Sequence, residues 1–172
     1  MTVSQLALNL KLADHAVFGS FYAGGNAAVV AFLRDRILER LEHGCWIWGA
    51  TGTGKSHLLQ ALCARAADGA QYLPLHELNA AGPDVLEGQG IRNIVCLDDL
   101  HSVAGDNAWE LALFELANQL ADNGGALVVS ATSPPREAGI RLVDLGSRMS
   151  KLPVFHLQPL DDAGRIEALR LR

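Results

Sequence analysis

The chain has 172 residues and a mass of 18.4 kDa, which is the size of one ordinary domain. Hydrophobic residues make up 49% of it and charged residues 19%, a balance that excludes disordered and collagen-like chains. The formal net charge of −5 argues against a domain that binds nucleic acid through bulk positive charge.

The predicted elements begin with an extended arm over residues 1–25, which turns at Gly24–Gly25. Asn26 is expected to cap a helix of apolar residues at helical spacing, and Gly44 is expected to end it. Further along, we predict strands over 45–48, 71–75, 93–97, 126–130 and 152–157, helices over 55–67 and 109–120, a short helix and loop within 76–92, and a last helix capped by Asp161 or Asp162. This alternation is typical of an α/β fold with a mainly parallel sheet, helices on both faces and ligands beyond the carboxyl ends of the strands.

The three cysteines, Cys45, Cys63 and Cys96, are far apart and lie in apolar contexts. They are predicted to be small buried hydrophobic residues, and the six scattered histidines offer no zinc-ligand spacing. No apolar run is long enough to span a membrane and no secretory signal is recognisable, so we expect a cytoplasmic protein.

The segment Gly49–Ser56 fits the phosphate-binding pattern G-x-x-x-x-G-K-[ST] at each fixed position. Its glycines allow backbone N–H groups to surround a phosphate, and the helix that follows directs its positive end at the same anion. Lys55 would neutralise the β- and γ-phosphates, and Ser56 would offer its hydroxyl to Mg²⁺. The alternative is a glycine-rich turn between strand and helix that binds nothing. The other loop residues expected around the phosphates are Gly49, Thr51, Gly52, Thr53 and Gly54.

One predicted strand ends in the acidic pair Asp98 and Asp99. Next to a phosphate-binding loop, Asp98 is expected to hold Mg²⁺ through water, and Asp99 to orient or activate an attacking water. The other interpretation is a strand-end turn with two solvated acids. Thr132 follows a neighbouring strand, where a polar side chain could sense the γ-phosphate; Ser130 or Ser133 could take that position instead, or none of them.

Arg148 closes the sequence Asp-Leu-Gly-Ser-Arg at positions 144–148. An exposed arginine there could reach the nucleotide of a neighbouring subunit as an arginine finger. The sequence pattern by itself favours an ordinary surface arginine.

Near the N-terminus, apolar residues alternate at Leu6, Leu8 and Leu10. The alternation by itself favours a short edge strand. The other possibility is an extended peptide that inserts Leu8 and Leu10 into an apolar pocket on a partner, with Gln5 hydrogen-bonding at the rim.

Together, these segments resemble the AAA+ domain of the DnaA family. The resemblance covers nearly the whole chain and rests on QLALNL at 5–10, FGSFYAGGN at 18–26, WG and GKSHLL within 48–59, LDDL at 97–100 and DLGSR at 144–148. Within that family, the chain is similar to the Hda-like regulators in two features: it has the N-terminal hexapeptide, and it lacks a helix-turn-helix domain. The resemblance implies a three-layer P-loop domain with a five-stranded, mainly parallel sheet and with most of the C-terminal helical lid absent.

The resemblance also implies a division of the chain into a clamp-binding arm (1–12), an AAA+ domain (13–160) and the start of a lid (161–172). It implies that ADP or ATP binds with Mg²⁺. Besides the phosphate loop, the implied nucleotide contacts are His57, Asp98 and Thr132, with a base pocket near Val17, Phe18 and Tyr22. Ser56 and Asp98 are the implied metal-binding residues.

The implied function is negative regulation of replication initiation. Such a protein docks on the sliding clamp of DNA polymerase III through Gln5, Leu6, Leu8 and Leu10, and it stimulates hydrolysis of ATP bound to DnaA. Arg148 would be the finger, homo-oligomers are possible, and sequence-specific DNA binding and membrane binding are not expected. Two alternatives remain: an autonomous AAA+ ATPase of the helicase-loader type, and a fragment of a DNA-binding initiator.

Overall fold

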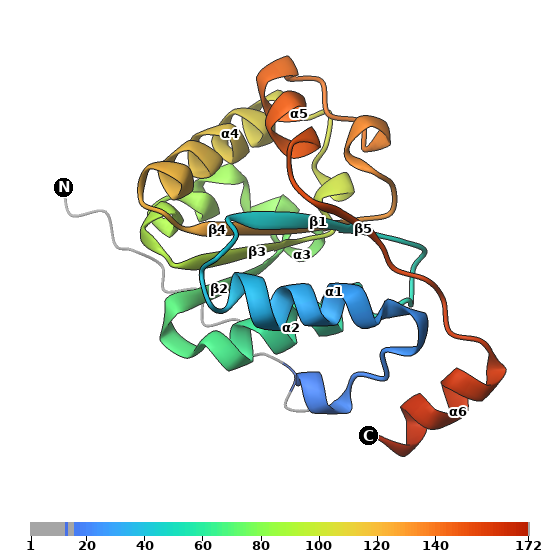
Figure 1. Cartoon of the computed structure of the whole chain (residues 1–172). Helices are drawn as coiled ribbons and strands as arrows, with labels where there is room; N and C mark the ends of the chain where they lie inside the picture. The colour runs from blue at the N-terminus through green and yellow to red at the C-terminus, as the bar shows by residue number, and fades with distance from the viewer. Residues whose placement is uncertain (1–12, 14–15, 172) are drawn as a thin grey trace.

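The computed structural model describes residue 13 and residues 16–171, which contain a five-stranded sheet in the order β2-β3-β4-β1-β5 (Figure 1). All neighbouring strands run parallel. The strands are β1 (Gly44–Trp48), β2 (Ala70–Pro74), β3 (Ile94–Asp98), β4 (Ala126–Ala131) and β5 (Val154–His156). The helices are α1 (Ala27–Phe32), α2 (Lys55–Ala66), α3 (Leu75–Leu78), α4 (Asn107–Asp122), α5 (Val143–Ser150) and α6 (Asp162–Arg170). The predicted five-stranded parallel α/β fold is confirmed.

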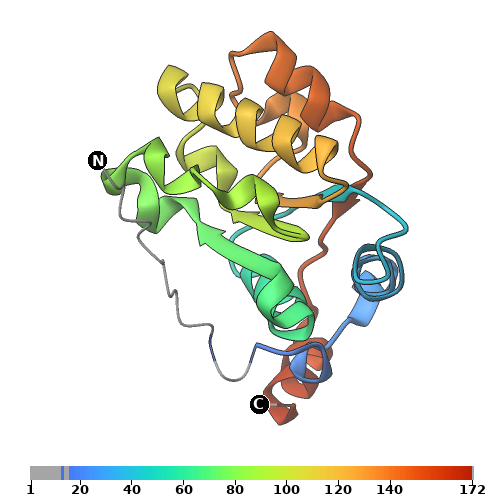
Figure 2. The same cartoon turned by 90° about the vertical axis from the view of Figure 1, so that its left-hand side faces the viewer.

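Alternate side chains of the central strands enter separate hydrophobic cores on the two faces of the sheet. In β1, Trp46 packs in the core beneath α4 and α5, whereas Cys45 and Ile47 pack in the core formed with α1 and α2. Figure 1 shows α4 and α5 on one side of the sheet and α1 and α2 on the other, and Figure 2 shows the same layers from the side. The three central strands, β1, β3 and β4, are apolar apart from Asp98 and Ser130 because they are covered on both faces.

The helix after Asn26 is shorter than predicted. Regular α1 ends at Phe32 and continues as a π-helical turn over Leu33–Ile37, and Gly44 begins β1 instead of ending the helix. A Cβ atom on Gly44 would lie 2.1 Å from the carbonyl oxygen of Leu127. Glycine is therefore required where β1 starts beside β4, not where a helix stops.

Asn26 occupies the N-cap position of α1, but its side chain makes no capping hydrogen bond. Instead, Nδ2 donates to the carbonyl oxygen of Gln158 at 3.0 Å, and the Gln158 N–H donates to Oδ1 at 2.8 Å. Asn26 is buried, so this two-way amide contact joins the start of α1 to the segment after β5.

Helix α5 (Val143–Ser150) is not predicted from the sequence. A central Gly146 and a length of only eight residues weaken the helical signal in the sequence. The helix is fixed by packing, because Leu145 and Met149, one turn apart, are both buried in the core shared with α4.

The prediction of an extended arm over residues 1–25 is wrong for the described part of that segment, where Phe18–Ser20 and Gly24–Asn26 each form a turn of 3-10 helix. The other predictions have the following outcomes. Cys45, Cys63 and Cys96 are buried and free of disulfides, as predicted. Asp161 caps α6, whose Gly164 N–H donates to its carboxylate at 2.7 Å. No helix in the described part of the chain is long and apolar enough to cross a membrane. The hexapeptide at 5–10 lies outside the described residues.

We expect Asn26→Ala to lower the free energy of unfolding by about 1–3 kcal/mol, because it removes both hydrogen bonds from a buried position. Asn79→Ala is the matched control, since the Asn79 side chain makes a single exposed contact with the carbonyl oxygen of Ser102. Urea unfolding followed by tryptophan fluorescence measures both variants. Equal stability losses would show that the Asn26 contact is not a structural tie.

Candidate functional site

The loop between β1 and α2 forms a cradle at the carboxyl end of β1. Gly52 and Gly54 have φ angles of +83° and +99°, a backbone region that favours glycine. A Cβ atom on Gly49 would lie 2.6 Å from the carbonyl oxygen of Leu157, and one on Gly54 would lie 2.8 Å from Cε2 of Phe21. We call this loop, residues 49–56, the phosphate cradle.

Lys55 fills the interior of the cradle and is 6% exposed. Its Nζ donates to the carbonyl oxygens of Gly49 at 2.8 Å and Ala50 at 2.9 Å. Burial lowers the pKa of Lys55, and the negative charges of Asp99 and Asp98 oppose that shift. A buried ammonium group that donates to neutral carbonyls would gain stronger, charge-assisted bonds from an anion.

The rest of the cradle presents its backbone. The hydroxyl of Thr53 donates to the carbonyl oxygen of Ala50 at 2.9 Å, which braces the loop, while Thr51 and Gly52 are exposed at its tip. The 12-residue α2 begins at Lys55, so the positive end of its dipole faces the same space.

The two acids at the end of β3 are in different environments. Asp98 is 2% exposed; its Oδ2 accepts a bond from the Tyr72 hydroxyl at 2.6 Å and its Oδ1 accepts one from the Ser130 hydroxyl. Asp99 has a φ of +59°, and its N–H donates to Oγ of Ser130 at 2.9 Å. Ser130 therefore holds both acids against β4.

Tyr72 connects Asp98 to the beginning of α2. Burial raises the pKa of the Tyr72 hydroxyl, and the charge and hydrogen bond of Asp98 raise it further, whereas hydrogen bonding with Gln60 and Ser56 lowers it. The hydroxyl is therefore protonated at neutral pH and can donate to Asp98. Through this tyrosine, the structure brings together Ser56 and Asp98, the two predicted metal-binding residues.

Of the three polar residues considered at the end of β4, Ser130 makes the contacts with the acids, and Thr132 is exposed just beyond the strand. Sequence reasoning missed Tyr72 and Phe21. Tyr72 looked like an ordinary strand aromatic, and the contact of Phe21 with Gly54 joins segments far apart in the chain. No local spacing signals either contact.

The segment before α1 packs on α2 beside the cradle. Nε2 of His57 hydrogen-bonds the carbonyl oxygen of Val17 at 2.9 Å, and Phe18 packs against the core of α1 and α2. Tyr22, farther along the same segment, packs beside α6. A Cβ atom added to Gly164 of α6 would lie 3.2 Å from Cε1 of Tyr22. Val17 and His57 are thus brought together, while Tyr22 is beside α6.

Arg148 lies on α5 at the other edge of the sheet. It borders a cavity with His43 and Gly125, which directly precede β1 and β4. Strands of five or six residues separate the two edges by roughly 15 Å, so Arg148 cannot reach a phosphate in its own cradle. Its guanidinium donates to Oδ1 of Asn118, and its Cζ is 5.8 Å from the ring centre of Phe114.

Glu110 fixes the start of α5. Its carboxylate is 2% exposed and accepts three backbone N–H bonds, from Gly105 at 2.7 Å, Arg141 at 3.0 Å and Leu142 at 2.6 Å. Burial raises the pKa of Glu110, but these hydrogen bonds outweigh it, and the pKa lies below its ordinary value. Because α5 begins directly after Leu142, this carboxylate positions the helix that carries Arg148.

No protein-family model matches the chain. Domain III of the replication initiation protein DnaA from Thermotoga maritima has a similar structure, with a TM-score of 0.79 and 24% identity over 93% of this chain and 74% of that one. For AMPPCP-bound DnaA from Aquifex aeolicus the TM-score is 0.75 and the identity 20%, over 93% of this chain and 55% of that one. For DnaI the TM-score is 0.63 and the identity 14%, over 78% of this chain and 85% of that one. The chain therefore has the same fold as DnaA domain III, and it spans about half the length of the Aquifex chain.

Glu110→Gln should lower the free energy of unfolding at pH 7 by about 2–4 kcal/mol, because an amide NH₂ would replace one acceptor oxygen among three N–H donors. The pKa of Glu110 is lowered by folding, so its stabilisation is present above the unfolded pKa and is lost as the pH falls through the folded pKa.

Urea unfolding between pH 7 and pH 3 tests this prediction. The original chain should lose stability more steeply than Glu110→Gln below about pH 4. The control is Glu115→Gln, an exposed position on the same helix, which should change stability by less than about 0.5 kcal/mol. Parallel pH profiles for the original chain and Glu110→Gln would contradict the assignment.

Proposed function

We propose that the phosphate cradle binds ADP or ATP together with Mg²⁺. The observation that carries the proposal is the buried ammonium group of Lys55, which donates to two neutral carbonyls inside a glycine-rich loop at the start of a helix. A nucleotide phosphate would replace these carbonyls with charged acceptors. The AMPPCP-bound DnaA from Aquifex, which has the same fold, supports this proposal.

In this proposal, the backbone of Gly49, Thr51, Gly52, Thr53 and Gly54 surrounds the phosphates. His57 also contacts the nucleotide, and the base pocket lies near Val17, Phe18 and Tyr22. Ser56 and Asp98 would hold Mg²⁺. Both Asp98 oxygens already accept hydrogen bonds, which suits a contact through water. Among the described residues, no three His, Cys, Asp or Glu side chains gather as a metal site, so most ligands would be phosphate and water oxygens.

Asp99 would orient the attacking water, with Ser130 or Thr132 as the polar residue near the γ-phosphate. When bound, Mg²⁺ would supply neutralisation of phosphate charge. The nucleotide-binding domain would comprise residues 13–160, and residues 161–172 would begin a helical lid.

We also propose that the chain acts on a second protein. Arg148 would stabilise the charge that develops on ATP bound to DnaA, while Gln5, Leu6, Leu8 and Leu10 dock on the sliding clamp. The separation of Arg148 from its own cradle supports action in trans. The net charge of −5 fits a cytoplasmic regulator that works through protein contacts and not through sequence-specific DNA binding. Such a regulator could also form homo-oligomers.

A second candidate is an autonomous ATPase of the helicase-loader or initiator type. The pair Asp98 and Asp99, whose charges act on Lys55, favours it, because these are groups that hydrolysis in the chain's own cradle would need. Turnover of ATP by the chain alone would distinguish this candidate from the regulator.

Lys55→Ala should weaken ADP binding by about a hundredfold or more, because the phosphates lose their buried counter-charge. Lys151→Ala, which removes an exposed lysine at the other edge of the sheet, is the control and should bind ADP normally. Isothermal titration calorimetry with ADP and Mg²⁺ measures both. Unchanged affinity in Lys55→Ala would refute the cradle as the nucleotide site.

Turnover of ATP preloaded on DnaA, in the presence of clamp-loaded DNA, tests the regulatory role. Arg148→Ala should retain ADP binding yet lose the stimulation, and Gln5→Ala with Leu8→Ala should lose clamp binding while the fold stays intact. Arg165→Ala, a change to an exposed arginine on α6, should have no effect. Full stimulation by Arg148→Ala would remove the finger role, and unchanged clamp affinity would remove the docking role of the arm.

A further inference from the structure

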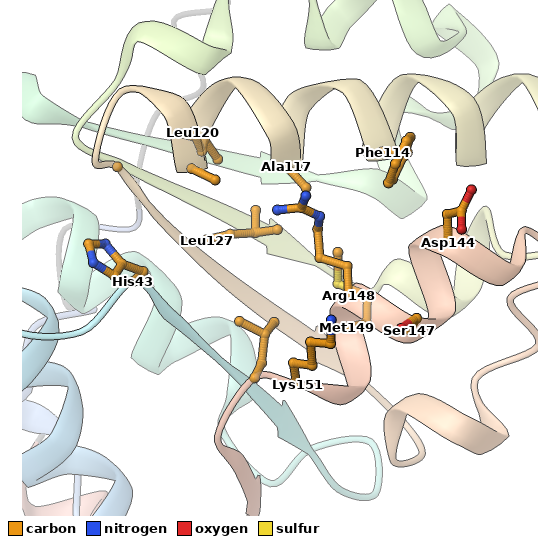
Figure 3. Close-up of a pocket in the computed structure, with 13 residues that line it drawn as sticks. His43, Phe114, Ala117, Leu120, Leu127, Asp144, Ser147, Arg148, Met149 and Lys151 are labelled. Atoms are coloured by element: carbon orange, nitrogen blue, oxygen red, sulfur yellow. The ribbon is translucent and has the colours of Figure 1, made fainter.

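A cavity of about 440 Å³ opens between α4, α5 and the beginning of β4 (Figure 3). It is on the opposite edge of the sheet from the phosphate cradle, and the two sites share no residue. Its apolar lining comprises Phe114, Ala117, Leu120, Ala121, Leu127, Met149 and Leu152. This volume is within the range of about 300–1,000 Å³ that is typical of small-molecule sites.

Basic side chains outnumber acidic ones around this cavity. His43, Arg148 and Lys151 border it, against the single acid Asp144. Figure 3 shows the guanidinium of Arg148 directed from α5 towards α4, with His43 on the other side of Leu127 and Asp144 nearer to Phe114. Among the described residues, no ion pair joins Arg148 or Lys151 to a carboxylate.

Arg148 is held in place by uncharged groups. One guanidinium nitrogen donates to the side-chain amide of Asn118, and the Phe114 ring lies beneath the guanidinium carbon. Arginine has five N–H donors in a planar fork, so the Asn118 contact leaves most of them available to a second acceptor. A carboxylate, like a phosphate, offers two oxygens that match that fork, and a carboxylate can also carry a hydrocarbon body that fits an apolar lining.

We propose that this cavity binds a small amphipathic carboxylate, with its charged group on Arg148 and Lys151 and its hydrocarbon body against Leu120, Leu127 and Leu152. The carboxylate group would supply the ion-pair partner that Arg148 and Lys151 do not have among the described residues. The leucines would supply an apolar contact that an inorganic anion could not use. The proposal goes beyond nucleotide binding. The carboxylate proposal does not depend on nucleotide binding, although a bound carboxylate would contact Arg148, the residue proposed above as the arginine finger.

Calorimetric titration of the full chain with octanoate tests the proposal, with octanamide as the uncharged ligand of equal size. Octanoate should bind at one site with a Kd on the order of 1 mM or below, as expected for a ligand of about ten heavy atoms. The Kd of octanamide should be at least about tenfold higher than that of octanoate, because octanamide cannot form the charge-assisted bonds.

Two kinds of variant locate the binding site. Arg148→Gln combined with Lys151→Gln should weaken octanoate binding by about tenfold or more, whereas Arg165→Gln on α6 should leave it unchanged. Ala121→Phe, at an exposed position of α4 that lines the cavity, should block octanoate by filling the space.

The proposal is overturned if octanoate fails to saturate, if octanamide binds equally well, or if the double variant binds octanoate normally. Circular dichroism confirms that each variant is folded. ADP titrations of the same samples separate this proposal from the nucleotide proposal, because loss of one ligand leaves the other site intact.

Discussion

The candidate site depends on one backbone constraint, the turn from β1 into α2 over Gly49–Gly54. Gly49 has no room for a side chain because the carbonyl of Leu157 is too close, and Gly54 has none because of the Phe21 ring. The loop is therefore shaped by the segment after β5 and by the segment before α1 as well as by its own sequence. Inside the loop, the buried ammonium group of Lys55 is bonded to loop carbonyls.

The parallel sheet separates two sets of functional groups. At the carboxyl ends of the strands, Ser130 and Tyr72 hold Asp98 on the acidic side of the cradle. Glu110 fixes the start of α5 after β4. From there α5 leads back toward the amino ends of the strands, where Arg148 borders the cavity with His43 and Gly125. If both proposals hold, a nucleotide and a second molecule would contact the chain at separate places, because the phosphate cradle and the cavity share no residue. This separation follows from strand direction, since every strand runs the same way.

The strands and the cradle were predictable because both are local patterns: buried parallel strands are continuous apolar runs, and the loop has fixed glycine and lysine positions. The contacts that position the site are not local. Asn26 looked like a helix cap, yet it binds the backbone of Gln158; α5 depends on packing and on the buried carboxylate of Glu110. A single sequence shows which residues can donate or accept, but not which distant partner each one meets.

The position of Arg148 creates a competition. The side chain carries one positive charge and one planar set of donors, and it is already held by Asn118 and Phe114 inside the cavity. A carboxylate that entered would neutralise that charge and engage the fork, so the guanidinium could not then stabilise phosphate charge on a partner. If both proposals hold, an amphipathic carboxylate would inhibit stimulation of the partner while leaving ADP in the cradle, because the two ligands bind at opposite edges of the same sheet.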